Sequence, residues 1–238
     1  MSLAGHLEDL RRRLGISLAA LLAAVGVCFT QAERLMLWLQ RPIEPLVPRL
    51  VFFSPAEPLL AHIKVSVLAG VLLAMPVILA QLWGFVGPGL TLRERAYGRA
   101  FVLWGSAQFL AGAAFAYYVL LPASLHVLLN VGRWYLEPAI SVDRYLSFVA
   151  SLVVWCGLVF ELPVVLFVLA RVGIVTAEWL RQQRPYAILI LVILAAVITP
   201  TTDPVSLLLM TAPLVVLYEL STIVARFALS RPPQEAPQ

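Results

Sequence analysis

The sequence predicts an all-α integral membrane protein with six transmembrane helices, and three observations support this fold class. First, 61% of the 238 residues are hydrophobic and only 13% are charged, with a mean hydropathy of +0.92. A soluble domain of this length needs far more charge to cover its surface. Second, the chain contains six apolar segments, and about 20 apolar residues suffice for a helix to cross the hydrocarbon core. Third, these runs are continuous, whereas the strands of a membrane barrel alternate between apolar and polar residues.

The six apolar segments leave no room for a separate soluble domain. We therefore expect a single polytopic membrane domain over residues 1–228 and a disordered, polar cytoplasmic tail over 229–238. The approximate spans are residues 14–30, 60–83, 100–121, 147–170, 186–198 and 205–225.

The distribution of basic residues predicts the orientation of the chain. With six spans both termini lie on one side, and that side holds eleven of the 17 lysines and arginines. The positive-inside rule then places both termini in the cytoplasm. The net charge of +4 follows from this bias, so it gives no reason to expect a nucleic-acid partner. The partner that the composition demands is the lipid bilayer.

The N-terminal stretch, residues 1–14, is short and amphipathic. Its leucines recur at helical spacing, and charged residues that include Glu8 and Asp9 cover the rest. We expect an interfacial helix on the cytoplasmic surface before the first span.

The two long external loops differ in character. Five prolines in the first loop, residues 31–59, exclude long uninterrupted helices there. The second loop, residues 122–146, carries aromatic side chains that are typical of anchors at the membrane surface, namely Trp134, Tyr135 and Tyr145.

The first internal loop lies in "QLWGFVGPGLTLRERAYGR", residues 81–99. Its Gly-Pro-Gly sequence predicts a helix end, and Glu94 follows between two arginines. Gln81, at the start of this stretch, is of a type that bonds across membrane helices, as is Gln108.

We expect the last two helices to be short. The 13 apolar residues 186–198 extend about 20 Å as a helix, against a hydrocarbon core of about 30 Å. The brief turn that follows carries Asp203, and the sixth segment contains Pro213 and is expected to end near Glu219.

An acidic residue, Glu161, interrupts the apolar segment "GLVFELPVVLF", residues 157–167. A charged side chain at mid-bilayer costs about 2.5–3.5 kcal/mol on insertion scales, so desolvation favours the neutral form of Glu161. Pro163 lacks an N–H, which leaves the carbonyl of Val159 without its usual helical partner. One interpretation is a self-satisfied kink that only packs the bundle. The other is an intramembrane functional site that offers a hydrogen bond to a partner helix.

The cytoplasmic acids Glu8, Asp9 and Glu94 also allow two interpretations. They could neutralise neighbouring arginines, or they could form a site for a basic ligand. Carboxylates bind guanidinium groups bidentately, so such a site favours arginine over lysine.

The sequence contains few candidate catalytic residues. Three histidines lie on different segments without ligand spacing, and no nucleophile, zinc or phosphate-binding motif occurs. We therefore predict no catalytic residue, metal site or cofactor. Three functional classes are compared: a receptor, a proton-coupled polytopic transporter that uses Glu161, and a membrane enzyme. A carrier needs a relay of intramembrane acids or histidines, which the sequence lacks, so the receptor is favoured.

The N-terminal sequence "HLEDLRRRL" resembles the first motif of TatC, the multispanning receptor of the twin-arginine protein translocase. The resemblance continues through "FFSPAEPLLAHIK", "PVILAQLWGFVGPGLTLRERA", "YLSFVASLVVWCGLVFELPVVLFVLARVGI" and "ITPTTDPVS", and it covers nearly the whole chain. It implies a curved bundle of six helices in a bacterial-type cytoplasmic (inner) membrane, with both termini cytoplasmic. It also implies Sec-independent export of folded proteins that uses the proton-motive force.

The resemblance also implies roles for single residues. Signal peptides with paired arginines would bind Asp9 and Glu94, and Glu8 could share the role of Asp9, which stands where the family usually has Glu. Glu161 would meet polar groups of partner helices. The further family-motif positions are Gln81, Phe85 and Asp203.

The partners implied by the resemblance are TatA- and TatB-like single-span subunits, twin-arginine signal peptides of folded cargo and other TatC copies. The family often has a glutamine where this chain has Leu207.

Overall fold

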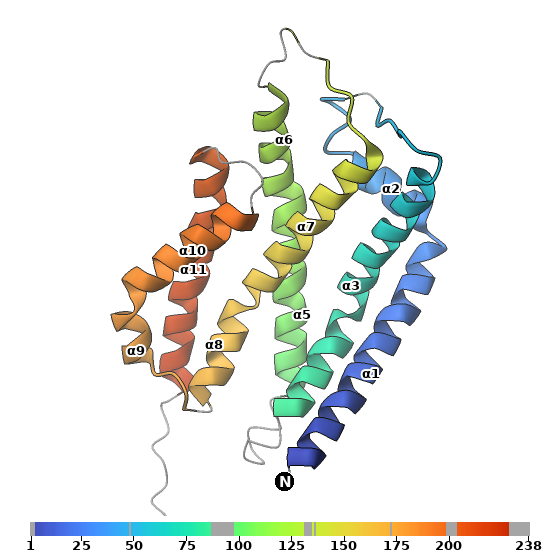
Figure 1. Ribbon diagram of the computed structural model, residues 1–238. Coiled ribbons are helices and arrows are strands. Elements are labelled where there is room, and N and C mark those ends of the chain that lie inside the picture. Colours follow the sequence, from blue (N-terminus) through green and yellow to red (C-terminus); the bar gives the residue numbers. More distant parts are fainter. Residues whose placement is uncertain are drawn as a thin grey trace, which may run out of the picture. The chain divides into compact units, whose positions relative to one another are not determined.

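The computed structural model describes residues 3–47, 49–86, 98–130, 135, 137–171, 173–198 and 204–228 (Figure 1). It contains two compact units, Met1–Leu158 and Val159–Gln238, and each is described by itself. Nearly all described residues are helical, and the one extended pairing among them is an isolated bridge between Val51 and Ser141. The predicted all-α class is therefore confirmed.

Five described helical stretches are long and apolar enough to cross a membrane, and a shorter apolar helix brings the count to the predicted six. The five are Leu7–Phe29, Glu57–Phe85, Gly98–Asn130, Val142–Ala170 and Ser206–Ile223, and the shorter helix is Arg184–Ile198.

The first unit is a bundle of long helices with a short helix, α2, near one end (Figure 1). Its elements are α1 (Leu3–Phe29), α2 (Ala32–Gln40), α3 (Glu57–Val86), α5 (Gly98–Phe115), the π-helical turn η2 (Ala116–Leu120), α6 (Leu121–Asn130) and α7 (Val142–Phe160, whose last two residues belong to the second unit).

The prediction of a separate interfacial helix over residues 1–14 is wrong, because α1 runs without a break from Leu3 to Phe29. No proline interrupts this stretch, and an internal glycine such as Gly15 costs a helix only about 1 kcal/mol. The α1 helix packs along α3. The two backbones approach closely at Gly70, where a Cβ would lie 2.6 Å from Cγ2 of Val25.

The core of the first unit includes a cluster of three buried side chains, Met75, Leu79 and Phe109. They come from α3 and α5, which pack against each other. Phe109 is 1% exposed. These contacts fix α3, whose last turn lies near the candidate site.

Two tyrosine hydroxyls fix the C-terminal end of α2. Tyr117 donates to the carbonyl of Trp38 at 2.5 Å, and Tyr145 donates to the carbonyl of Leu39 at 2.7 Å. The last carbonyls of a helix have no partner within the helix, so these hydroxyls satisfy them. Tyr145 is buried, so its prediction as an anchor at the membrane surface is wrong. Tyr135 is exposed, and Trp134 lies outside the described residues.

The second unit contains α8 (Leu162–Arg171), α9 (Ala177–Gln182), α10 (Arg184–Ile198) and α11 (Pro204–Ala228). Helix α11 packs against the other three helices and contributes the buried side chains Met210 and Leu214.

The prediction that the last two helices are short is confirmed for α10, with 15 residues, and wrong for α11, with 25 residues. Helix α11 continues through Pro213 and beyond Glu219. In this last part the hydroxyls of Ser221 and Thr222 donate to carbonyls four residues earlier, so these polar side chains are satisfied within the helix. The predicted tail, residues 229–238, lies outside the described residues.

Candidate functional site

The structure separates the two acids at the start of α1. Glu8 is exposed, whereas the side chain of Asp9 is 32% exposed and forms an ion pair with Arg13. Nε of Arg13 donates to Oδ2 of Asp9 at 2.8 Å. The two residues are four positions apart, so they lie on one face of α1. Of the two acids, Asp9 is therefore the one whose carboxylate has a defined orientation.

The guanidinium of Arg13 also lies against the last turns of α3. A Cβ at Gly84 would overlap Nη1 of Arg13 and would lie 2.9 Å from its Cζ. Only a glycine at this position leaves room for the guanidinium. Asp9 is thereby linked, through Arg13, to the end of α3.

Two predicted family-motif positions, Gln81 and Phe85, lie on these last turns of α3. Both are partly buried, and because they are four residues apart they share one face of the helix. The helix ends at Val86, as the Gly-Pro-Gly sequence predicts. Glu94 lies in the segment that follows, outside the described residues, and Asp203 also lies outside them.

Glu161 lies at a break of one residue between α7 and α8. The residue is 6% exposed, and neither carboxyl oxygen has a hydrogen-bond partner among the described residues. Pro163 falls in the first turn of α8, where the missing N–H leaves no helical bond unmade. Pro163 therefore leaves no helical hydrogen bond unmade, whereas the carboxyl of Glu161 has no described partner. This does not support the interpretation of a kink whose polar groups are all satisfied within the chain.

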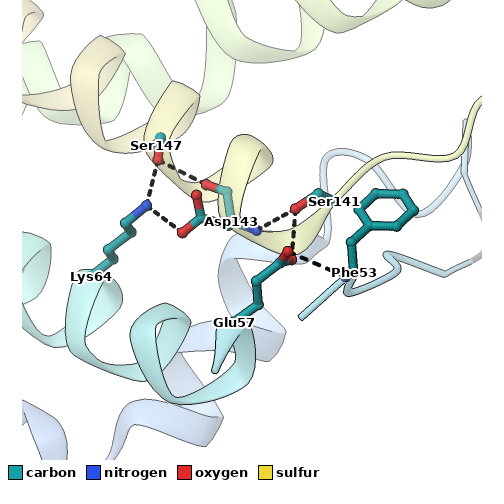
Figure 2. A network of polar contacts seen from close by, with 6 residues as sticks. All are labelled: Phe53, Glu57, Lys64, Ser141, Asp143 and Ser147. Carbon is teal, nitrogen blue, oxygen red and sulfur yellow. Dashed lines mark hydrogen bonds and ion pairs between the residues drawn. The ribbon is translucent and has the colours of Figure 1, made fainter. Parts of the chain in front are cut away.

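A polar network joins α3 to the start of α7 and was not predicted from the sequence (Figure 2). Lys64 forms an ion pair with Asp143, and its Nζ also donates to Oγ of Ser147 at 2.8 Å. The hydroxyl of Ser147 donates to the carbonyl of Asp143 at 2.8 Å. A lysine inside an apolar helix was the sequence signal that could have revealed this pair, because such a charge needs a partner.

The same network extends to the segment before α3 (Figure 2). The hydroxyl of Ser141 donates to Glu57 at 2.8 Å, and the other oxygen of Glu57 accepts from the backbone N–H of Phe53 at 3.2 Å. Beside them, the N–H of Val142 donates to the carbonyl of Val51 at 2.9 Å. These hydrogen bonds join the segment before α3 to the segment before α7. Both segments lie at the opposite end of the first unit from Asp9 (Figure 1).

No three histidine, cysteine, aspartate or glutamate side chains lie together as a metal site in the part of the chain that the structure describes.

Comparison with known proteins decides the family. The profile described as "Sec-independent protein translocase protein (TatC)" matches residues 5–213. This chain belongs to the TatC family. The Sec-independent protein translocase protein TatC of Aquifex aeolicus (strain VF5) is 42% identical over 235 residues, which is 96% of this chain and 96% of that protein. The protein of the same description from Carboxydothermus hydrogenoformans is 37% identical over 227 residues, covering 95% and 93%.

Solved structures agree with this assignment. A crystal structure described as the twin arginine translocase receptor TatC matches with a TM-score of 0.80 and 39% identity, covering 95% of this chain and 100% of that one. The chain is therefore a multi-pass membrane component of the Tat protein translocase, as its TatC-like motifs predict. The comparisons give no support to the alternative of a proton-coupled transporter.

Proposed function

We propose that this TatC-family chain is the receptor that binds twin-arginine signal peptides of folded precursor proteins at the cytoplasmic face of a bacterial-type inner membrane. In this proposal both termini are cytoplasmic, and the chain binds and scaffolds without catalysing a reaction. The observation that carries the proposal is the partly exposed carboxylate of Asp9, whose partner Arg13 lies beside the last turns of α3. Glu94 follows in the segment directly after that helix.

Two carboxylates suit a ligand with two guanidinium groups. Each guanidinium can donate two parallel hydrogen bonds to a carboxylate, which an ammonium group cannot do. The proposed pair is Asp9 on α1 and Glu94 after α3. Glu8 is exposed and adds negative charge next to Asp9.

Glu161 supports a second part of the proposal, the assembly of the translocase. A buried polar group without a hydrogen-bond partner costs about 1–3 kcal/mol, and Glu161 has no described partner. A polar group on a partner helix would remove this cost. We propose that Glu161 attaches TatA- or TatB-like single-span subunits, and that copies of this chain assemble around them.

The same acid does not make a convincing proton carrier. A proton relay through a membrane uses a chain of acids or histidines. Glu219, the acid nearest the end of the last apolar stretch, forms an ion pair with Arg184, whose Nε donates to Oε1 at 2.5 Å. Glu161 alone is not a relay.

The receptor proposal is tested by measuring the binding of a fluorescent twin-arginine signal peptide to the purified protein. Asp9→Asn and Glu94→Ala should each weaken binding about 10-fold or more, because a hydrogen bond to a charged group contributes about 1.5–3 kcal/mol. A twin-lysine peptide should bind the wild-type protein more weakly than the twin-arginine peptide.

Glu178→Gln is the matched control, because Glu178 is an exposed acid on α9, which follows the fourth span. It should leave binding unchanged. Equal binding of both peptides, unaffected by Asp9→Asn and Glu94→Ala, would mean that the two acids only balance local arginines.

A further inference from the structure

We infer that Arg13 is a positioning residue for the proposed signal-peptide site. It fixes the carboxylate of Asp9 and thereby contributes to the preference for arginine over lysine. The inference rests on the proposed function, because it adds a residue to the same site. Arg13 itself does not contact the peptide in this account; it acts through Asp9.

The first observation is the geometry of the ion pair. Arg13 uses Nε to bind one oxygen of Asp9, Oδ2, at 2.8 Å. This contact restrains the plane of the carboxylate, and it occupies one of its two oxygens. The side chains of Arg13 and Asp9 are 26% and 32% exposed, so water reaches the pair but does not surround it.

The second observation is that the guanidinium packs against α3. Its terminal nitrogens lie over Gly84, in the space that a side chain at that position would fill. A cation near the C-terminus of a helix is also favoured by the helix dipole. Arg13 is therefore restrained both by Asp9 and by α3. Arg11 and Arg12, by contrast, are exposed.

The consequence for recognition follows from ligand geometry. A guanidinium is a planar fork, and it binds best to a carboxylate whose plane is already fixed. An ammonium is a compact point charge, and the plane of the carboxylate matters little to it. When Asp9 is already fixed, less conformational entropy is lost as the peptide binds. The resulting gain in affinity is larger for a peptide that carries arginines than for one that carries lysines.

The opposite effect would arise if Arg13 were an internal competitor for Asp9. The peptide would then have to displace it, and removing Arg13 would strengthen binding. The contact with Gly84 argues against this, because a guanidinium that α3 holds can remain beside Asp9 when a second guanidinium arrives.

The test compares two variants with one control, each measured with twin-arginine and twin-lysine peptides on the full-length protein. Arg13→Lys keeps the charge but removes the planar fork. Gly84→Ala pushes the guanidinium out of its place without changing Arg13 itself. Arg12→Lys makes the same change at an exposed neighbour.

Arg13→Lys and Gly84→Ala should each weaken binding of the twin-arginine peptide about 5- to 10-fold while changing binding of the twin-lysine peptide less than about 2-fold, because only the guanidinium needs a fixed carboxylate plane. The ratio of the two affinities should fall, and Arg12→Lys should leave it unchanged. A purely structural role would lower the melting temperature without moving this ratio.

The outcomes separate this inference from the proposed function. If Asp9→Asn abolishes the preference for arginine but Arg13→Lys and Gly84→Ala do not alter it, the inference alone is overturned. Tighter binding by Arg13→Lys would identify a competitor and would also overturn it. If the wild-type protein shows no preference for arginine, the proposed function fails and the inference fails with it.

Discussion

At the residue scale, Glu161 differs from its neighbours because its backbone carbonyl has hydrogen-bond partners and its carboxyl group has none among the described residues. The carbonyl of Glu161 accepts from Val164 and Val165 at 3.0 Å each, so the first turn of α8 is well formed. The residue is only 6% exposed, and its carboxyl has no described partner. A buried carboxyl without a partner destabilises the isolated chain, and a polar group on a partner helix would remove this cost.

Glu161→Leu should therefore have opposite effects on the stability of the chain and on its assembly with partner subunits. The free energy of unfolding in detergent should rise by about 1–3 kcal/mol, since the buried carboxyl no longer lacks a partner. Co-purification of the TatA- and TatB-like subunits and export of a twin-arginine cargo should both fall. Thermal unfolding and pull-down from membranes measure the two effects.

Ser106→Ala is the matched control for this change. Its hydroxyl is also buried without a described partner, but it lies on α5 in the other unit. It should not reduce assembly. If Glu161→Leu left both co-purification and export intact, the attachment role of Glu161 would be wrong.

At the element scale, the nine-residue helix α2 is too short to be stable on its own. Its position depends on other helices, through the hydroxyls of Tyr117 and Tyr145 and through the ring of Trp38. That ring stacks on Tyr117 with 4.1 Å between centroids. The network of Glu57, Lys64, Ser141, Asp143 and Ser147 holds the neighbouring segments together (Figure 2).

Removal of one hydroxyl should loosen α2 selectively. Tyr145→Phe keeps the buried ring but leaves the carbonyl of Leu39 without its donor, which should cost about 0.5–1.5 kcal/mol of unfolding free energy. Hydrogen exchange should accelerate in residues 32–47 before it accelerates elsewhere. Tyr118→Phe removes a hydroxyl from an exposed ring beside Tyr117 and serves as the control. Equal exchange rates in both variants would contradict the role given to Tyr145.

The elements also show what the sequence could predict. Six apolar segments, the helix end before Gly87 and the break near Pro163 were predicted from composition and helix-breaking residues, which act locally. The continuity of α1 was not, because three successive arginines suggest a surface helix. Their place in one long helix depends on packing against α3. The pair of Lys64 and Asp143, 79 residues apart, likewise required the tertiary structure.

The site was predictable only in part for the same reason. The resemblance to TatC implies a binding role for Asp9, which stays a prediction, and the structure adds what distinguishes Asp9 from Glu8, namely the contact with Arg13. The close approach of Arg13 to Gly84 joins residues of two helices and leaves no pattern in the sequence.

At the scale of the whole molecule, the apolar helices differ in length. Helix α10 has 15 residues, which extend about 22 Å, whereas the hydrocarbon core is about 30 Å thick. A short helix thins the bilayer around it or draws its flanking residues inward. A translocase that passes folded proteins would benefit from a thinner membrane.

This mismatch predicts a dependence on lipid length. In vesicles of lipids with shorter acyl chains the protein should unfold at a higher temperature than in vesicles of longer-chain lipids, because less deformation is needed around α10. Extending α10 by one helical turn of leucines should shift the optimum toward longer chains. Equal stability in both lipids, for both proteins, would contradict a role for the short helix in thinning the bilayer.

The central claim, that signal peptides are recognised beside Asp9 and Glu94, is tested most directly by mapping the bound peptide. A twin-arginine peptide with a photo-reactive group next to its arginines would be cross-linked to the protein in membranes, and the attachment sites read by mass spectrometry. We expect cross-links within residues 5–13 and 81–99. These cross-links should be lost when the peptide carries lysines or when Asp9 and Glu94 are replaced by their amides. Cross-links concentrated in the segments before α3 and α7, and unaffected by those replacements, would contradict recognition beside Asp9 and Glu94.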